Sequence, residues 1–559
     1  MTLPQSNPNP QAFAITHEVF NQTPPLLDFN AFDCDTALKE GVVRAGAVWA
    51  IPQLTEYGAR IGSAEVTRWG FEVNEFKPQF FSHDRNGHRI DLVKYHDSYH
   101  QLMSMALTAG IHSAPWVTPE PGAHVTRAAK VYLQAQADAG HGCPLTMTFA
   151  AVPTLDTTPA LAREWLPKIL ANGYDPRNVP YTEKMALTIG MGMTEKQGGS
   201  DVRANTTTAH ALGTGGTGEA YELVGHKWFT SAPMCDAFLM LGQSRGGLAC
   251  FLVPRWRPDG SKNPVEVQRL KNKMGNVSNA SSEIELRGAL GWMVGDEGRG
   301  VWTIIEMVAM TRFDCMLGSS ASQRQGVAQA IHHAEHRSAF GKTLIHQPLM
   351  RNVLADLQLE VEGSLAIALR MARALDHTQD VHEQLLLRIG VPVGKYWICK
   401  RSPFHAYEAM ECLGGNGVIE DFITARLYRD APINAIWEGS GNVQALDVLR
   451  ALSRTPEALE AWLLELDKGH GNHATLDASV ARLKAQLADM TDAEYRARHL
   501  VDQLALTMQA SLLVQAGNNA VAGAFIASRL GTQSDRNYGT LPRGLDIDTI
   551  IARGNPTVS

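Results

Sequence analysis

The apolar positions of the chain change their spacing along its length, and each spacing predicts a different kind of element. Near the N-terminus, apolar side chains recur every three or four residues, which is the period of an amphipathic helix. This spacing predicts helices over 37–51, 98–113 and 124–140. Residues 1 to about 30 are rich in Pro, Asn and Gln, which predicts irregular or partner-bound structure there.

From about residue 185 to 290 the pattern changes to short runs separated by turn residues. The length of these runs and the residues between them are typical of strands. Strands are predicted over 186–194, 206–212, 220–231, 237–244, 248–256, 265–270 and 281–288. We therefore expect a small all-β domain in this part of the chain.

Helical spacing returns after about residue 298. It predicts long helices over 300–338 and 349–376 and further amphipathic helices over 456–469 and 478–515. The fold class is therefore mainly α, with a central small β-barrel or β-sandwich domain and an extra C-terminal helical domain. We expect four domains: 1–182, mostly helical; 183–292, the β domain; 293–450, a helical bundle; and 451–559, a C-terminal helical extension.

Composition and charge exclude several classes of protein. The chain has 559 residues, 44% hydrophobic and 19% charged, with a net charge of −7, which describes a globular protein with no evident polyanion partner. Its seven dispersed cysteines contain no CxxC pair, which favours reduced thiols in the cytoplasm and argues against a metal site. The first residues, MTLPQSNPNPQAF, lack the basic start and apolar run of a signal peptide, and no apolar run is long enough to span a membrane.

One motif suggests a nucleotide site that its context does not support. Gly213, Gly215 and Gly218 fit the dinucleotide pattern GxGxxG. That pattern is meaningful only between a strand and a helix, because the helix N-terminus holds the pyrophosphate. Both flanks here are predicted strands, so we interpret these glycines as a flexible hairpin connection.

A single carboxylate, Glu438, stands between an apolar-aromatic run and a Gly-Ser-Gly turn. Rigid apolar support before it and a close backbone turn after it would hold a desolvated general base against a flat cofactor. The alternative is a surface glutamate at a helix start, where the helix dipole favours negative charge. The residues of this segment that would line such a cofactor are Ile436, Trp437, Gly439, Ser440 and Asn442.

Two further segments carry small residues and hydroxyl groups that suit a planar, polar-edged ring. Each also has a plain structural interpretation, as a Gly-rich turn or as a strand with an exposed hydroxyl. The candidate cofactor residues in MGMTEKQGGSD are Met191, Gly192, Met193, Thr194, Gly198, Gly199 and Ser200. In KWFTS they are Phe229, Thr230 and Ser231.

These segments, with IWEGSGN, HRSAFGKTLIHQ and ECLGGNGV, resemble the motifs of the acyl-CoA dehydrogenase family in the same order. The resemblance implies bound FAD and an acyl-CoA substrate, with Glu438 taking the α-proton while the β-hydride passes to flavin N5. It places Thr194 at the pyrimidine edge of the flavin and Ser231 near N5. Phe229 stands at a position where the family usually has Trp, a change that keeps stacking but removes a donor.

The same resemblance implies a flavin site shared between subunits of a homotetramer. Arg337, Phe340 and Gln347 match the RxxFGxxLxxxQ motif, and Gly414 and Gly415 match the family's Gly-Gly segment. Arginine suits a pyrophosphate because its planar fork donates paired, charge-assisted hydrogen bonds. The alternative is a basic helix C-terminus that the dipole stabilises.

The resemblance is most specific to the AidB-type subgroup, bacterial flavoproteins tied to the response to DNA alkylation. Some acyl-CoA dehydrogenases carry the base at the position of Thr311, which cannot act as one, so the assignment stays with Glu438. An alternative function is DNA protection, with weak or vestigial dehydrogenase activity. Residues 451–559 hold 10 Lys and Arg against 12 Asp and Glu. Any binding of double-stranded DNA is therefore expected to be weak and nonspecific.

Overall fold

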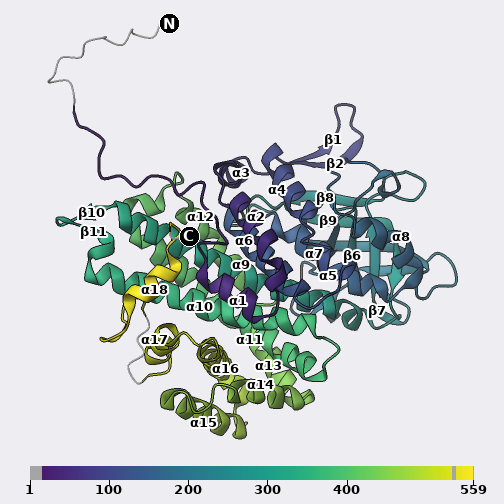
Figure 1. Cartoon of the computed structure of the whole chain (residues 1–559). Helices are drawn as coiled ribbons and strands as arrows, with labels where there is room; N and C mark the ends of the chain where they lie inside the picture. The colour runs from purple at the N-terminus through teal and green to yellow at the C-terminus, as the bar shows by residue number, and fades with distance from the viewer. Residues whose placement is uncertain (1–15, 532–536, 558–559) are drawn as a thin grey trace, which may run out of the picture.

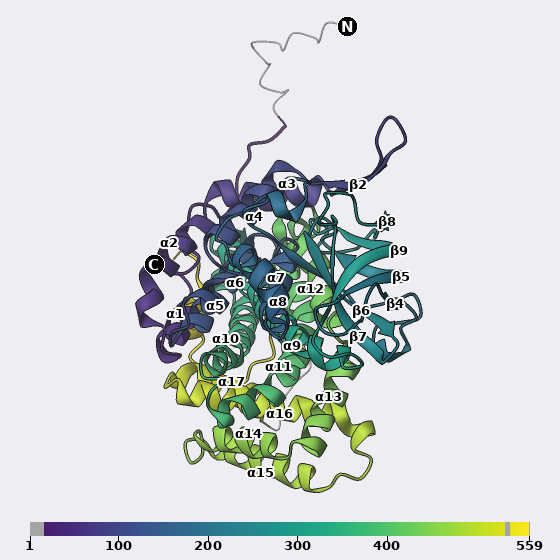
Figure 2. The ribbon, with the colours of Figure 1, turned by 90° about the vertical axis from the view of Figure 1, so that its right-hand side faces the viewer.

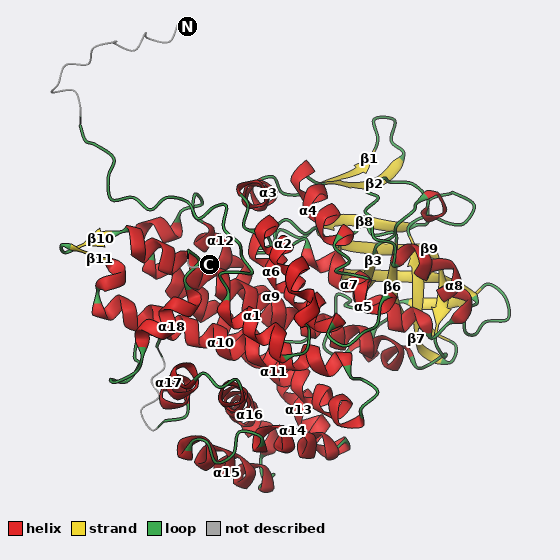
Figure 3. Ribbon diagram, viewed as in Figure 1, coloured by secondary structure: helices red, strands yellow, loops and turns green. Residues whose placement is uncertain are grey.

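In the computed structural model, residues 16–531 and 537–557 are described, and they form a helical body with a β domain on one side (Figure 1). Figure 3 shows the strands of the β domain gathered at one end, whereas helices make up the middle and the lower part of the molecule. Residues 16–35 contain no helix or strand. The first half of the predicted irregular N-terminus, up to residue 15, lies outside the described residues.

The N-terminal region is helical, with one hairpin that the spacing of apolar residues does not reveal. Strands β1 (Gln79–His83) and β2 (Arg89–Lys94) pair antiparallel and project above the body (Figure 1). Asp84 binds the N–H groups of Asn86 and His88, which closes the turn between these strands. The helices are α1 (Thr36–Arg44), α2 (Ile51–Ile61), α3 (Ala64–Glu75), α4 (Asp97–Thr108), α5 (Ala114–Val117), α6 (Ala123–Ala137), α7 (Gly142–Asp156) and α8 (Pro159–Ile169).

The β domain is one seven-stranded sheet with a partly closed path. The strand order is β3-β6-β4-β5-β9-β7; β8 pairs with β9, and an additional pairing of β6 with β7 joins the path back on itself. Its strands are β3 (Ile189–Gly192), β4 (Thr208–Ala211), β5 (Ala220–Ser231), β6 (Ala237–Ser244), β7 (Gly247–Pro254), β8 (Val265–Leu270) and β9 (Ser281–Val294). The GTGGTG stretch connects the antiparallel strands β4 and β5, which confirms its interpretation as a hairpin connection.

Four helices form the central bundle: α9 (Gly300–His336), α10 (Pro348–Asp376), α11 (Val381–Cys412) and α12 (Ile423–Ile436). Helix α11 contains Pro392 and Pro403, so its helical run was not evident from the sequence. A short two-stranded ladder, β10 (Ser338–Ala339) with β11 (Lys342–Thr343), follows α9. In Figure 1 this ladder lies at the opposite end of the molecule from the β domain.

The C-terminal block covers the lower side of the bundle, where Figure 2 shows α13 to α17 beneath α10 and α11. Its helices are α13 (Gly441–Arg454), α14 (Glu457–Asp467), α15 (Ala474–Ala488), α16 (Ala493–Gln515), α17 (Asn519–Arg529) and α18 (Ile547–Gly554). The run predicted as one pattern over 478–515 is broken at residues 489–492, where Asp492 has φ +51°.

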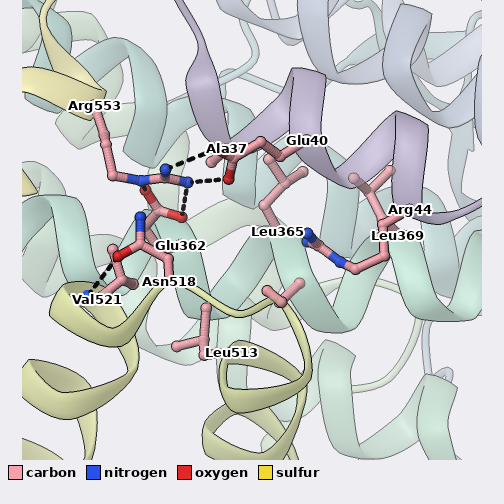
Figure 4. Close-up of a pocket in the computed structure, with 12 residues that line it drawn as sticks. Ala37, Glu40, Arg44, Glu362, Leu365, Leu369, Leu513, Asn518, Val521 and Arg553 are labelled. Carbon is pink, nitrogen blue, oxygen red and sulfur yellow. Dashed lines mark hydrogen bonds and ion pairs between the residues drawn. The ribbon is translucent and has the colours of Figure 1, made fainter. Parts of the chain in front are cut away.

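Helix α18 returns to the start of the chain. Arg553 pairs with Glu362 of α10 (2.6 Å) and with Glu40 of α1 (2.7 Å), as Figure 4 shows. The buried Arg324 of α9 also donates to the Gly554 carbonyl at 2.6 Å. These contacts fix the last helix against both the first helix and the centre of the bundle.

Candidate active site

The chain turns sharply between α12 and α13, and Glu438 occupies the turn. Glu438 has φ +57°, a left-handed conformation that is costly for a residue with a side chain, and Gly439 follows with φ +97°. We call residues 437–439 the elbow. A strained glutamate persists only where the surroundings hold it, so its contacts are informative.

Three side chains hold the elbow through its carbonyl groups. Lys395 Nζ donates to the Trp437 and Gly439 carbonyls at 2.8 and 2.6 Å. Arg312 Nε donates to the Glu438 carbonyl at 2.9 Å, and Gln444 Nε2 to the Glu438 and Gly439 carbonyls at 3.0 and 2.9 Å. Within the described residues, no hydrogen bond engages the Glu438 N–H group. The elbow is thus fixed on its carbonyl side and free on the N–H side.

The Glu438 carboxylate accepts one hydrogen bond, from Thr311 Oγ1 at 2.8 Å. Burial raises the pKa of this carboxyl, while the Thr311 hydrogen bond and the nearby Arg312 and Lys395 cations oppose the rise. A raised pKa makes a carboxylate a stronger base. Thr311 therefore lies next to the predicted base, Glu438, as a hydrogen-bond donor to its carboxylate.

Arg312 is itself held by a charge cluster on α13. Its NH1 atom pairs with Asp447 at 2.9 Å, and Asp447 also pairs with Arg388 at 3.0 Å. The sequence offered no signal for these residues, nor for Lys395, because they lie on three different helices. They link the elbow to α9, α11 and α13.

A buried ion pair anchors the segment 191–200, and one of its two members, Glu195, belongs to the segment. Glu195 and Lys227 are both fully buried and lie 2.8 Å apart. Burial opposes the charged form of Glu195, but the Lys227 charge and, secondarily, hydrogen bonds from the Thr206 and Thr207 N–H groups lower the pKa of this carboxyl. This pair fixes the loop beside β5, where the Trp228 N–H donates to the Thr194 carbonyl at 2.8 Å.

The predicted flavin residues of these two segments lie side by side. A Cβ atom at Gly199 would collide with Thr194, and one at Gly192 would lie 3.3 Å from Thr230 Oγ1. Phe229 is 49% exposed, so a ring face is available for stacking. The remaining predicted residues here line the same strand and loop: Met191, Met193, Gly198, Ser200 and Ser231.

A half-buried lysine, Lys273, adjoins this region and was not predicted. Lys273 Nζ donates to the Asn279 carbonyl at 2.8 Å and to Ser281 Oγ at 3.2 Å, and Ser281 Oγ lies 3.1 Å from Ser231 Oγ. Burial lowers the pKa of Lys273 to about 8. A chain of polar groups therefore runs from Lys273 to Ser231.

Cys143 connects the β domain with the elbow. Burial raises the pKa of this thiol to about 11, and the Glu438 carboxylate adds to the rise, whereas the Lys273 charge and the neighbouring Ser231 and Asn279 side chains oppose it. The same thiol is therefore close enough to sense both groups. The space around Cys143 thus adjoins Ser231 of the β domain and Glu438 of the elbow.

The other predicted cofactor residues lie far from this space. Arg337 ends α9, and its NH1 atom donates to the Asn21 carbonyl at 2.5 Å; Gln347 donates to the Ala339 carbonyl at 3.0 Å. Phe340 is fully exposed. All three adjoin the β10–β11 ladder, at the end of the molecule opposite the β domain (Figure 1).

Gly414 and Gly415 lie at the same end of the bundle. Both are exposed, and a Cβ atom at either would meet nothing within 4 Å. Helix α9 ends, α10 begins and α11 ends at the same end of the bundle, and the two glycines directly follow α11. The structure therefore brings the predicted residues together in two separate groups.

Two of the predicted residues at or beside the elbow, Trp437 and Asn442, have hydrogen-bond partners within the chain. Trp437 Nε1 donates to Asn434 at 2.8 Å, and Asn442 accepts a hydrogen bond from Arg498 at 2.8 Å. Ile436 is 65% exposed. Asn442 thus joins the elbow to the C-terminal block, and Ser440 is an exposed N-cap position of α13.

Three family models match successive parts of the chain. The adaptive response protein AidB N-terminal domain matches residues 21–176, the acyl-CoA dehydrogenase middle domain matches 190–289, and the acyl-CoA dehydrogenase C-terminal domain matches 298–453. The fold and the order of these matches define a member of the acyl-CoA dehydrogenase class.

Individual relatives agree with this class. AidB of Escherichia coli (strain K12) is 44% identical over 520 residues, 93% of this chain and 95% of that protein. Acyl-CoA dehydrogenase family member 11 of Caenorhabditis elegans is 30% identical, covering 90% of this chain and 81% of that protein. The chain belongs to the acyl-CoA dehydrogenase family, with AidB among its relatives.

Solved structures give the same result for the fold. The structure of C. elegans ACDH-11 in complex with C11-CoA has a TM-score of 0.82 and 26% identity, covering 98% of this chain and 94% of that one. A structure described as the Bd2924 apo-form has a TM-score of 0.79 and 27% identity, covering 90% and 99%. The predicted fold class and the predicted family are confirmed. Among the described helices, none combines the length and apolar character of a membrane span.

Proposed function

We propose that the protein is an FAD-dependent acyl-CoA dehydrogenase in which Glu438 is the catalytic base. The observation that carries this proposal is the elbow. It presents one carboxylate with a raised pKa, held by a backbone that three side chains fix from behind. Structural ion pairs do not need a strained backbone, whereas preorganised catalytic groups often have one.

The residues facing Cys143 fit a flavin ring. Thr194 and Ser231 are partly exposed, so their hydroxyl groups can meet the polar edge of a ring. The exposed side chain of Phe229 offers the matching apolar surface. We assign the ring edge to Thr194 and Ser231, whereas Thr230 is fully buried beside Gly192 and supports the strand from behind.

In this proposal the protein holds the thioester so that its α-carbon faces Glu438. The free N–H group of Glu438 donates to the thioester carbonyl, which makes the α-proton more acidic. The Glu438 carboxylate then takes that proton, and Thr311 keeps the carboxylate aimed at it. Bound FAD would supply the oxidant, by accepting the hydride of the β-carbon.

An acyl thioester is supported as the substrate class by the relatives. The solved structure of ACDH-11 is that of the protein in complex with C11-CoA. Its likeness extends over 98% of this chain, including the C-terminal block. We further propose four domains, with boundaries at residues 182, 292 and 450, and a cytoplasmic location. The seven cysteines form no disulfides.

We also propose a homotetramer whose FAD sites are shared between subunits. Arg337 and Gln347 adjoin the β10–β11 ladder, which lies at the opposite end of the molecule from the β domain that carries Phe229 (Figure 1). The end of the bundle that carries them is apolar and exposed. Exposed side chains there are Phe340 (100%), Leu349 (82%), Phe404 (64%) and Val418 (63%). Exposed apolar side chains at one end of a protein are typical of an interface.

Anaerobic titration of purified protein with a panel of acyl-CoA thioesters tests the activity. We expect bound FAD at up to one per chain, and bleaching of its absorbance by at least one thioester. Light scattering of the same sample tests the assembly, and a flavin-loaded monomer would overturn the shared site. FMN in place of FAD, or no bleaching by any thioester, would contradict the dehydrogenase assignment.

A second candidate function, DNA protection, rests on the similarity to AidB and on a few exposed arginines. Arg454 has no acidic partner within the described residues, and Arg450 is 56% exposed. Arg450, however, is paired with Asp447, and two further cations of the block are also paired, Lys484 with Asp467 and Arg496 with Asp489. Paired cations release few counterions from DNA, so only weak, nonspecific binding is expected.

Fluorescence anisotropy of a labelled duplex at two salt concentrations tests this second function. We expect no binding tighter than roughly micromolar, with a shallow dependence on salt. Tight binding that Arg454→Ala abolishes would make DNA protection the primary function. Arg163→Ala, an exposed arginine on α8, is the matched control.

A further inference from the structure

Lys273 and two serines form a short chain of polar groups at one end of the β domain, and the pairing of the strands brings them together. Ser231 of β5 and Ser281 of β9 are direct cross-strand partners, so their side chains lie on the same face of the sheet. Their hydroxyl oxygens lie 3.1 Å apart. Lys273 follows β8, which pairs with β9 at the same end, and its Nζ atom lies 3.2 Å from Ser281 Oγ. We call these three residues the relay.

The ammonium group sets the direction of the hydrogen bonds in the relay. An ammonium donates and cannot accept, so Ser281 Oγ is the acceptor of the bond from Lys273. Among the described residues, the other side-chain partner of Ser281 is Ser231, so the Ser281 hydroxyl donates to it. The hydrogen of Ser231 then remains for another acceptor. The neighbouring Cys143 thiol is only a weak acceptor, which leaves this hydrogen for a ligand.

The charge of Lys273 is not neutralised by a direct ion pair. Within the described residues, no carboxylate lies in ion-pair contact with Lys273, and its Nζ atom donates to the Asn279 carbonyl at 2.8 Å instead. Partial burial of a cation without a paired carboxylate is costly, and burial lowers the pKa of Lys273 to about 8. A neutral side chain would avoid this cost, so the position of the charge calls for a functional explanation.

We propose that Lys273 is a positioning residue, which acts through Ser281 to hold Ser231 as a hydrogen-bond donor to the polar edge of the flavin ring and places one positive charge behind that edge. The inference rests on the proposed function, because the ring is that of the FAD assigned there. Ser231 is partly exposed and can reach a ligand, whereas Ser281 is buried and transmits the orientation. Hydrogen bonds in a chain polarise one another, so the cation strengthens the donor at the far end.

A positive charge behind the ring edge favours the reduced ring, because reduction adds electron density to it. Three hydrogen-bonded steps of about 3 Å each separate Lys273 Nζ from the ring edge. At that distance and an effective dielectric constant of about 20, one charge changes the equilibrium between oxidised and reduced ring by roughly ten-fold. This factor corresponds to about 30 mV for a two-electron couple.

The other charged groups around Lys273 do not titrate in the same pH range. They are Cys143 of α7, Asp430 of α12 and Asp138, which follows α6. Burial raises the pKa of Cys143 to about 11 and that of Asp430 to about 6. At Asp138 burial opposes the charged form, but the hydrogen bond and charge of His141 prevail and lower the pKa. Only Lys273 of this group therefore changes its charge near pH 8.

Reductive titration of the FAD-containing protein with dithionite and a reference dye tests the charge. In Lys273→Met the equilibrium should shift roughly ten-fold toward the oxidised ring at about pH 7. Because the cation is present only below its pKa, the difference from wild type should shrink to about two-fold at about pH 9. Glu438 is present in both proteins, so its titration cancels in the difference. Equal potentials of the two proteins at about pH 7 would overturn the proposal.

The NMR resonance of flavin N5 in isotope-labelled FAD tests the orientation of Ser231. Ser281→Ala interrupts the relay and keeps the cation, so it should move this resonance as far as Lys273→Met does. It should shift the redox equilibrium less, by at most about three-fold, because the charge remains. An N5 resonance that stays at the wild-type position in both variants would contradict the relay.

Lys262→Met is the matched control. Lys262 is also a half-buried lysine of the β domain with a pKa lowered by burial, but it pairs with Asp91 of β2 at 2.7 Å. This variant should be less stable and should keep both the wild-type redox equilibrium and the wild-type N5 resonance. If it changes them as Lys273→Met does, loosening of the β domain explains the effect and the relay has no special role.

The titration needs no thioester, so it separates this inference from the proposed function. A ten-fold shift in Lys273→Met in a protein whose flavin no acyl-CoA reduces would support the relay and contradict the dehydrogenase assignment. Normal reduction by an acyl-CoA with equal potentials in wild type and Lys273→Met would have the opposite meaning.

Discussion

The two groups of predicted cofactor residues differ in how far their own chain completes them. At the elbow, the carbonyls of three successive residues accept five hydrogen bonds from Lys395, Arg312 and Gln444. At the β10–β11 end, Phe340 is fully exposed, and Gly414 and Gly415 have open space around them. The side chains of one subunit complete the surroundings of the first group, whereas the second group lies on an exposed surface.

This difference predicts that the elbow governs the chemical step, whereas the open end governs how well the cofactor is retained. Substitutions at the elbow should change the rate of proton abstraction and leave the flavin bound. Substitutions at the open end should release flavin and leave the chemistry of the loaded sites intact. Variants of the two groups can therefore test whether the separation holds.

The largest effect is expected for Glu438→Gln. Flavin reduction by an active acyl-CoA should fall by roughly 10²–10⁴-fold, because the general base is lost, while the FAD content stays at the wild-type value. Stopped-flow absorbance under anaerobic conditions measures the rate.

The same variant should also change stability in a defined direction. Folding raises the pKa of Glu438, so the folded state binds a proton more tightly than the unfolded state above pH 4.5. Wild-type stability is therefore lost as pH rises through this window, and Glu438→Gln should remove that loss. In the rate measurement, flavin reduction at the wild-type rate in Glu438→Gln would show that another residue is the base.

A smaller loss of activity is expected for Lys395→Met. Lys395 is buried and donates to two elbow carbonyls, so its loss leaves the Trp437 carbonyl unpaired and the Gly439 carbonyl with Gln444 alone, which lets Glu438 move. A shift of about 1 Å at a catalytic group can cost about 10²-fold, and we expect roughly 10–100-fold in kcat with unchanged FAD content. Single-turnover reduction and the flavin-to-protein absorbance ratio measure the two quantities.

Lys130→Met is the matched control for this variant. Lys130 is also buried and donates to a carbonyl, that of Ala109, at 3.0 Å, far from the elbow. It should lower the free energy of unfolding without lowering kcat. If both lysine variants reduce kcat equally, general destabilisation explains the effect and the elbow has no special role.

Arg337→Ala tests the open end. Loss of a charge-assisted hydrogen bond to a phosphate should weaken FAD retention by roughly ten-fold or more, while the remaining loaded sites react at the normal rate. Flavin loss during gel filtration measures retention.

In this chain Arg337 also binds the Asn21 carbonyl, so the variant could act by releasing the N-terminal segment. Thr23→Val removes a neighbouring contact of that segment, the hydrogen bond between Thr23 Oγ1 and His333 Nδ1 at 2.9 Å. It leaves Arg337 intact and should retain FAD. Equal flavin loss in both variants would contradict a direct contact of Arg337 with the cofactor.

The smallest effect concerns Lys273. Burial lowers its pKa on folding, from 10.5 to about 8, so folding releases its proton and protonation opposes folding. Stability contributed by this group should rise between pH 8 and 10.5, by at most about 1.4 kcal/mol per pH unit. Urea unfolding across this range should show the rise in wild type and not in Lys273→Met. The exposed Lys196→Met is the control, and it should retain the wild-type slope.

The sequence was sufficient for the fold class because its signals are local. Strand-length runs between turns predicted the β domain, and the flanks of Gly213–Gly218 correctly excluded a nucleotide-binding helix. The β1–β2 hairpin was not predicted, since it is short, half exposed and closed by Asp84 rather than by a glycine motif alone.

The candidate site could be predicted only where its residues adjoin one another in the chain. Glu438 and its neighbours form one motif, and the motif predicted a held carboxylate. Lys395 and Asp447 act on that motif from other helices, and no spacing in the sequence connects them to it. The roles assigned to Thr194, Ser231 and Arg337 remain predictions of the family resemblance.

The ion pairs of Arg553 have a consequence for biosynthesis. They join positions 40 and 553, separated by 513 residues, and Arg324 binds the carbonyl of the next residue, Gly554. Residue 553 leaves the ribosome only after nearly all of the described chain has been made. Helix α1 and the bundle therefore lack their contacts with α18 throughout translation. Contacts this distant in sequence form late and slow the completion of folding. A chain interrupted before α18 leaves Glu40, Glu362 and Arg324 without these partners, and this exposes unfinished products to chaperones and proteases.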